Sequence, residues 1–202
     1  MAATPRVTVL TLDQRRSRAG DDAVPGLLAD LADLGDRLLR PFQRTAGDEA
    51  QAVTDDRDTA VEVVARALRS GRWNLGIGVG AVRTPLPAET RAGSGDAFVA
   101  AREAVTRAKS DLHRLAVVAR PERPEAVELE TVLGLWAAVV ERRTERGWEV
   151  HDLLASGLSY GEAGERLGIS QSAVSQRARA AGLVDERRAR VLASVLWGRL
   201  LS

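Results

Sequence analysis

The sequence predicts an α+β protein in which a mainly antiparallel sheet, with helices over one face, precedes an all-helical region. Upstream of residue 120, strand-like apolar segments alternate with segments that have helical spacing. Downstream of residue 125, every segment has helical spacing. The joint at 120–125 (RPERPE) combines two prolines with four charged residues, which is typical of an exposed linker. We therefore expect one domain over 1–120, a linker over 121–125 and a second domain over 126–202.

Strands and helices alternate in the expected first domain. The strands cover 6–12, 42–46, 50–53, 73–82 and 112–119, where β-branched or continuously apolar residues gather. The helices cover 24–40, 95–108 and the segment after Asp55 or Asp56, either of which can cap it. Gly47, Asp48 and Glu49 form a hairpin signal between the second and third strands. The order β-α-β-β-α-β-α-β predicts a ferredoxin-like layout with an extra element.

The second half is predicted to be helical throughout. Apolar residues recur at helical spacing over 126–146, 148–155, 160–167, 171–181 and 185–200. The first and last of these helices carry long apolar stripes. Each stripe can either pack inside the helical domain or form the contact between two copies of the chain, and the sequence leaves both open.

Residues 159–182 have the pattern of a helix-turn-helix. Ser159 can cap the first helix, and Glu162 stands three residues later, as a capping box requires. Gly168 ends that helix, because a left-handed backbone costs least at glycine. Ser170 can cap the second helix and Gly182 ends it. We therefore expect the domain over 126–202 to bind double-stranded DNA.

The outward face of the second helix supports this expectation. With the alanines and valine of this helix turned inward, hydrogen-bonding side chains face out, and no acidic residue occurs between 171 and 183. Glutamine can pair with adenine, arginine with guanine, and serine with bases or phosphates. The predicted DNA contacts are Ser170, Gln171, Ser172, Ser175, Gln176, Arg177 and Arg179, and Arg166, Arg187 and Arg188 are further candidates for phosphate contacts. The alternative is a helical hairpin that only packs, or one that binds protein.

Composition limits the other possibilities. The net charge is +1, so DNA contacts must come from local arginines and not from a globally basic surface. The chain has no cysteine, which excludes disulfides and thiolate metal sites. No apolar run reaches the length of about 18 residues that a membrane span needs, and the first residues lack the order of a signal peptide. We expect a cytoplasmic protein that does not bind membranes and that forms a homodimer on two DNA half-sites.

Three segments of the first half together resemble the SatD family of small bacterial proteins. They are VTVLTLDQRRSR, FQRTAGDEAQAV, and RWNLGIGVGAVRT leading to GSGDAFVAAREAV. The matching residues are Asp13, Ser17, Arg18, Gly47, Asp48, Glu49, Gly76, Gly78, Ala101, Arg102 and Glu103. Many members of that family end in a helix-turn-helix, so the resemblance spans nearly the whole chain.

The same half is distantly similar to class III nucleotide cyclases and diguanylate cyclase domains. That similarity implies a cyclase-like fold and a magnesium site made by Asp13 and Asp48, with Arg102 near a nucleotide or phosphate ligand. Phe98 stands where the cyclases have an asparagine, and the hairpin lacks the doubled glycine of the diguanylate signature. These departures favour a ligand pocket without turnover. The plain alternative is that Asp13 caps a loop and Asp48 sits in a turn.

Three functional hypotheses follow. The first is a sequence-specific transcriptional regulator whose N-terminal domain dimerises, senses a nucleotide, or both. The second is a magnesium-dependent nucleotide cyclase or phosphotransfer enzyme that uses Asp13 and Asp48. The third is a structural dimerisation scaffold with no ligand.

Overall fold

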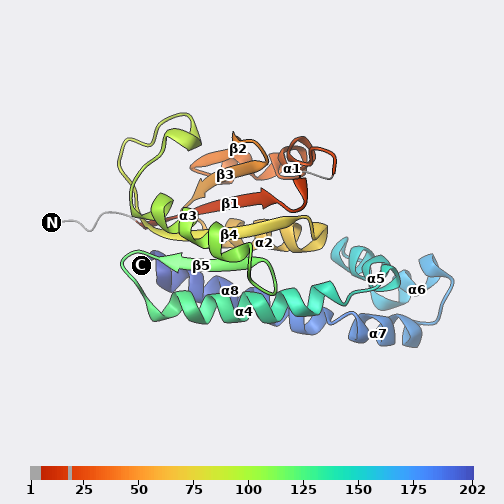
Figure 1. The fold of residues 1–202 in the computed structure, drawn as a ribbon. Helices are drawn as coiled ribbons and strands as arrows, with labels where there is room; N and C mark the ends of the chain where they lie inside the picture. The colour runs from red at the N-terminus through yellow and green to blue at the C-terminus, as the bar shows by residue number, and fades with distance from the viewer. Residues whose placement is uncertain (1–5, 18–19) are drawn as a thin grey trace.

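The computed structural model describes residues 6–17 and 20–202 (Figure 1). It confirms an α+β fold built on one sheet. The strands are β1 (Arg6–Gln14), β2 (Arg40–Ala46), β3 (Glu49–Thr54), β4 (Trp73–Ala81) and β5 (Leu115–Ala119). The α-helices are α1 (Val24–Asp30), α2 (Arg57–Ser70), α3 (Asp96–Ala108), α4 (Pro124–Glu141), α5 (Glu145–Ala155), α6 (Tyr160–Leu167), α7 (Gln171–Ala180) and α8 (Leu183–Leu201). None of the helices in these described ranges combines the length and apolar character needed to cross a bilayer.

The sheet is mixed. Its strand order is β2-β3-β1-β4-β5, with antiparallel pairing everywhere except between β4 and β5, which are parallel. The parallel pair follows from the chain path, because α3 crosses over between β4 and β5 and returns the chain to the same end of the sheet. The expected mainly antiparallel sheet is therefore confirmed, and β5 is the one strand that pairs in parallel.

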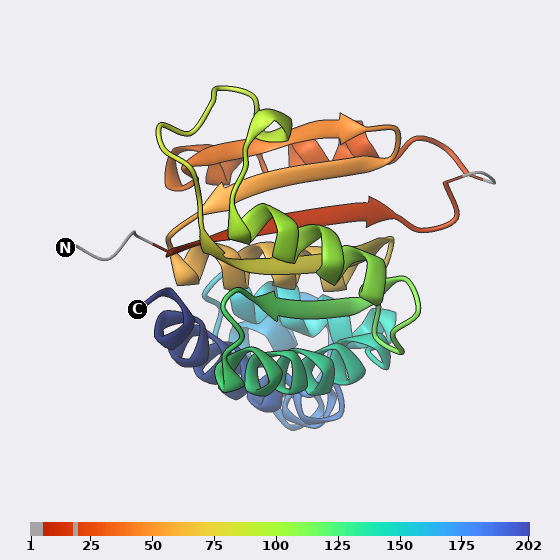
Figure 2. The same ribbon diagram turned by 60° about the vertical axis from the view of Figure 1, so that its left-hand side comes forward.

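One face of the sheet forms the main hydrophobic core. Alternate residues of β1 and β4, such as Leu10 and Ile77, point to this face and are fully buried. Helices α2, α4 and α8 cover it (Figures 1 and 2). Their largest buried contributions are Leu129, Leu133, Trp136, Leu196, Trp197 and Leu200.

Helix α3 covers the opposite face, which corrects the expectation of helices on one face only (Figure 2). The pattern of the strands agrees with two covered faces. β1 and β4 are buried on both sides and do not alternate between apolar and polar residues. Gly76 and Gly78 of β4 let α3 approach closely: a Cβ on Gly78 would lie 2.1 Å from the Ala101 nitrogen. Ala97 and Ala101 of α3 provide the other half of the contact at Gly78.

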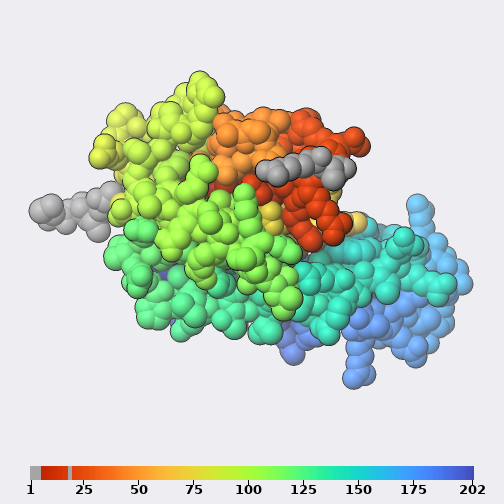
Figure 3. All heavy atoms as spheres, viewed as in Figure 1, coloured from red at the N-terminus to blue at the C-terminus, as the bar shows by residue number. Residues whose placement is uncertain are grey.

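The core does not divide at the expected linker 121–125. Helices α4 and α8 share their apolar residues with the sheet, so the second half of the chain completes the core of the first. Hydrogen bonds also join the two ends of the chain. Trp197 Nε1 donates to the Thr8 hydroxyl (2.8 Å), and Arg6 Nε donates to the Leu200 carbonyl (2.8 Å). Helices α5, α6 and α7 have a small core of their own, and they project from one end of the molecule (Figures 1 and 3).

Four expected boundaries were wrong by three or more residues, one of them the start of α5, which lies at Glu145 and not at 148. The helix expected over 24–40 is α-helical only to Asp30 and is followed by a 3₁₀ helix over Ala32–Arg37. Leu31, between the two, and Leu34, three residues later, are both buried. Helix α4 ends at Glu141, five residues before the expected end. Strand β5 begins at Leu115 and not at 112, and the Leu112 side chain stays exposed.

Candidate nucleic-acid interface and polar cluster

Local capping fixes α6 and α7 as the sequence predicts. The Ser159 hydroxyl accepts a hydrogen bond from the Glu162 N–H, and the Glu162 carboxylate accepts one from the Ser159 N–H at 2.7 Å, which completes the capping box. This bonding lowers the pKa of the Glu162 carboxyl. Gly168 adopts the left-handed conformation at the end of α6, and the Ser170 hydroxyl accepts from the Ala173 N–H (3.2 Å) to begin α7.

A small apolar core holds α7 against its neighbours. Val174 and Ala178 turn inward and pack with Ala163 of α6 and Val150 of α5. Gly164 lets the turn pass close to α6, since a Cβ there would lie 2.7 Å from the Ile169 carbonyl oxygen. The motif is therefore three helices, with α5 supporting the pair that the sequence identified.

The opposite side of α7 is open to solvent. Gln171, Ser172, Ser175, Gln176 and Arg179 are all exposed, and no described segment of the chain covers them. This arrangement leaves the side chains of Gln171, Ser175, Gln176 and Arg179 free to meet a ligand, whereas the Ser172 hydroxyl is hydrogen-bonded to that of Ser170. Figure 3 shows α7 on the projecting end of the molecule.

Two of the predicted contacts differ from the rest. Ser170 is exposed, but its hydroxyl already caps α7 and lies 2.9 Å from the Ser172 hydroxyl. Arg177 is half-buried, and its Nη1 lies 3.8 Å from a carboxylate oxygen of Glu149. Both residues therefore have a role within the fold, whereas Gln176 and Arg179 have none in the described structure.

An aromatic and charged junction sets the orientation of the three-helix unit. Trp148 of α5 lies between two guanidinium groups, those of Arg69 (4.5 Å from the ring centre) and Arg143 (4.3 Å). Arg69 of α2 also pairs with Asp152, with Nη2 2.7 Å from Oδ2. That pairing lowers the pKa of Asp152 to about 2.

A buried ion pair completes the junction. Arg143 Nη2 lies 2.6 Å from Glu186 of α8, and Arg143 Nε donates to the Ala181 carbonyl (3.0 Å). The turn of the chain that brings Arg143 into this position also ends α4 before the expected residue 146. Removing one partner of a buried pair leaves an uncompensated charge, so this contact resists displacement of α7 from the body.

A cluster of polar side chains lies on the α3 face of the sheet. Asp13 of β1 stands opposite Glu49 of β3 and Asn74 of β4. Its carboxylate accepts from Asn74 Nδ2 (3.0 Å) and lies 2.7 Å from Lys109 Nζ at the end of α3. Arg102 Nη1 lies 3.8 Å from Glu49. The two buried carboxylates are thus each accompanied by a cation from the same helix.

This cluster does not fit a magnesium site as it stands. Lys109 and Asn74 already engage the two carboxylate oxygens of Asp13, one each. Asp48 lies in the hairpin turn, and its backbone carbonyl accepts from the Gln14 N–H (3.0 Å). Within 6–17 and 20–202, no group of three or more acidic or histidine side chains could hold a metal ion. The structure therefore offers no geometry for a step through magnesium.

The other residues of the SatD resemblance have structural roles or lie outside the description. Gly47 takes a left-handed backbone in the hairpin. Gly76, Gly78 and Ala101 form the close contact between β4 and α3. Glu103 pairs with Arg120 at 2.7 Å. Arg18 lies outside the described residues, next to Ser17, which lies inside them.

Sequence reasoning missed Lys109 and Asn74 as members of the cluster. The sequence held one signal, because Lys109 is its only lysine among 29 basic residues. No local pattern identified Asn74. A polar residue in a glycine-rich strand can be assigned to a polar cluster only when the residues of the neighbouring strand are known.

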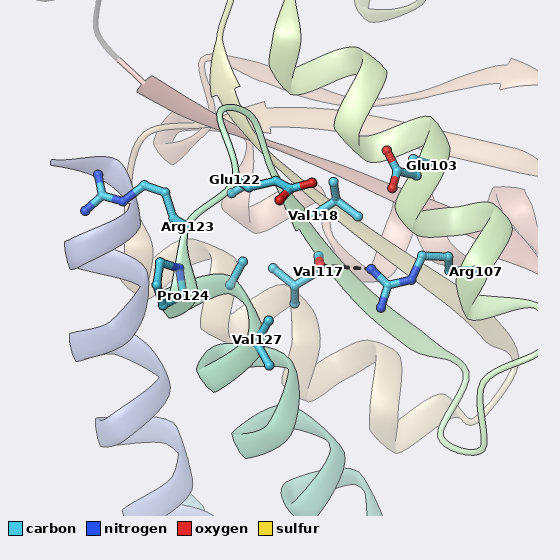
Figure 4. Close-up of a pocket in the computed structure, with 10 residues that line it drawn as sticks. Glu103, Arg107, Val117, Val118, Glu122, Arg123, Pro124 and Val127 are labelled. Carbon is cyan, nitrogen blue, oxygen red and sulfur yellow. Dashed lines mark hydrogen bonds between the residues drawn. The ribbon is translucent and has the colours of Figure 1, made fainter.

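A surface depression borders the free edge of β5 (Figure 4). The Val117 N–H donates to the Glu130 carboxylate (2.7 Å), and Arg107 Nη1 donates to the Val117 carbonyl (3.4 Å). Arg107 and Glu130 also pair with each other at 2.9 Å. These two side chains occupy the edge groups that another strand would otherwise use, which protects the sheet from edge-to-edge association.

Comparison with known proteins gives little further guidance. No protein-family model matches the chain, and no curated protein matches it. Among solved structures, it is similar to the crystal structure of a regulator of polyketide synthase expression from Bifidobacterium adolescentis. The identity is 14%, the TM-score is 0.27, and the match covers 98% of this chain and 86% of that chain. A TM-score of this size does not establish a common fold.

Proposed function

We propose that this protein is a cytoplasmic transcriptional regulator that binds double-stranded DNA sequence-specifically through α7. The observation that carries the proposal is the division of α7 into two sides. Val174 and Ala178 anchor one side, while Gln176 and Arg179 stand free on the other. A helix held in this way by a supporting helix and a tight turn can enter the major groove and present its side chains to base edges.

The charge around α7 is compatible with a phosphate backbone. Arg166, Arg187 and Arg188 are exposed near the motif, and none forms an ion pair with a described residue. Such contacts position a protein on DNA and carry no sequence information. Ser170 and Arg177 remain candidates of the same kind, after rearrangement of the contacts described above.

The body of the protein is proposed to hold two copies of α7 in a fixed relation. A SatD-like, cyclase-like ancestry for the sheet remains part of this proposal. We do not extend it to a magnesium-dependent enzyme, because Lys109 and Asn74 already engage both carboxylate oxygens of Asp13. A nucleotide ligand could act on the regulator only by favouring one arrangement of the two copies over another.

The test is selection of bound fragments from genomic DNA, followed by titration of the selected site and a scrambled site at fixed salt. The wild type should prefer the selected site. The double variant Q176A/R179A should lose that preference, since each good base contact is worth about 1–3 kcal/mol of discrimination. R83A is the matched control, because Arg83 is exposed and belongs to the loop after β4, and this loop lies at the end of the molecule opposite α7 (Figure 1).

Each possible result of this experiment either supports or excludes the proposal. Loss of discrimination in Q176A/R179A with R83A unchanged supports it. If the wild type does not distinguish selected from scrambled DNA, or if the double variant discriminates as well as the wild type, base recognition by α7 is excluded.

A further inference from the structure

The outer groove between α4 and α8 is apolar and open to solvent. Its apolar lining comes from Val132, Leu135, Trp136 and Val139 of α4 and from Ala189 and Leu192 of α8, and Asp185 and Arg188 of α8 also line it. Leu135 is 66% exposed and Leu192 49% exposed. The inner sides of the same helices fill the main core, so both helices are apolar on two sides, and only the inner one is covered by the described chain.

Charges of opposite sign flank these two leucines symmetrically. Glu128 and Arg142 lie seven residues before and after Leu135. Asp185 and Arg199 lie seven residues before and after Leu192. Seven residues make about two helical turns, so each set lies along one side of its helix.

These four charges are available to a partner. All are exposed, and none forms an ion pair with another described residue, although Arg142 Nε donates to the carbonyl of Ala138 (2.9 Å). Each helix therefore has an acidic end, an exposed leucine at its middle and a basic end.

We propose that this face binds the same face of a second copy of the chain around a two-fold axis. Such an axis places each helix antiparallel to its own copy, so that a residue and its counterpart exchange contacts. Glu128 of each copy then lies near Arg142 of the other, and Asp185 of each near Arg199 of the other. Leu135 and Leu192 enter the groove of the opposite copy. The alternative two-fold axis, along the helices, would instead place Glu128 near Arg199 of the other copy, so the charge exchange described below distinguishes the two arrangements.

The proposed dimer rests on the proposed function only for its biological purpose, which is to hold two copies of α7 on DNA. Helices α5–α7 lie beyond the C-terminal end of α4 (Figure 1). An axis through the middle of α4 and α8 therefore leaves one α7 at each end of the dimer, as binding to two separate half-sites requires.

The experiment measures molar mass by sedimentation and light scattering on the full chain without DNA. The wild type should be a dimer at micromolar concentration, and L135E/L192E should be a monomer with an unchanged circular dichroism spectrum. L112E is the matched control: Leu112 is 83% exposed and lies outside the groove, so this variant should remain dimeric.

A charge exchange tests the orientation. E128R and R142E should each weaken the dimer by about tenfold, because the contact occurs twice in a symmetric interface. The double variant E128R/R142E should restore the wild-type dissociation constant. A non-specific apolar contact would give no such restoration.

Several results would overturn the inference: a monomeric wild type at tens of micromolar, a dimeric L135E/L192E, or a double charge variant no better than the single ones. Failure of the proposed function has a different signature. Q176A/R179A should dimerise normally whether or not α7 reads DNA, and the mass measurement does not depend on DNA.

Discussion

At the scale of single residues, close backbone approach decides which side chains are allowed. The N–H of Ala101 lies directly over Gly78, so any side chain at 78 must displace α3 from the sheet. The C-terminal end of the same helix supplies Lys109 to the buried carboxylate of Asp13. The glycines of β4 therefore determine how closely α3 packs on the sheet, and this distance decides whether the cationic side chains of α3 reach the polar cluster.

The variant G78A tests this dependence. It should lower the free energy of unfolding by at least about 1–3 kcal/mol, because a buried methyl group would overlap the α3 backbone. Urea unfolding followed by circular dichroism measures the change. G26A is the control, since Gly26 of α1 has open space around it and should be neutral or stabilising by up to about 1 kcal/mol. Equal stability of G78A and wild type would contradict the close contact.

At the scale of elements, the helices near the proposed DNA-binding face are defined by their ends. Ser159, Gly168 and Ser170 act within a few residues of chain, and α6 and α7 begin where these residues predict. Helix α6 has only eight residues, which is too short to be stable alone. Its caps and the small core under α7 therefore carry the stability of the motif.

The variant S159A should destabilise the three-helix unit by about 1 kcal/mol through loss of its N-cap. Amide hydrogen exchange of α6 and α7 is the appropriate measurement, because opening of this unit need not involve the sheet. S175A is the matched control: Ser175 is exposed, caps no helix, and should change stability by less than about 0.5 kcal/mol. Unaltered exchange in S159A would show that packing alone holds α6.

At the scale of the whole molecule, the chain closes on itself. The last helix lies against the first strand through Trp197 and Thr8, and α4 and α8 cover a sheet face that the first 120 residues cannot cover alone. The proline-rich joint at 120–125 and the change of pattern across it suggested an independent first domain, but such local features do not show which helices bury which face.

A chain truncated after residue 120 should therefore fail to fold. It would expose the side chains of β1, β4 and β5 that pack on α4 and α8 in the full chain, a loss of many kcal/mol at about 25 cal/mol per Å² of apolar surface. The expected result is no cooperative thermal transition and poorly dispersed amide resonances, compared with the full chain. A cooperative transition in the fragment would instead support the boundary at 121–125.

The sequence by itself determined the α+β class, the order of the elements and the boundaries of α6, because periodicity and capping act over a few neighbouring residues. Ser159, Glu162 and Gly168 needed no distant partner to be interpreted. Tertiary structure alone decided that α3 covers the second face, that α4 and α8 belong to the core of the sheet, and that Lys109 meets Asp13. These contacts join residues far apart in the chain, and their free energy depends on which surfaces meet, a property that no local pattern encodes.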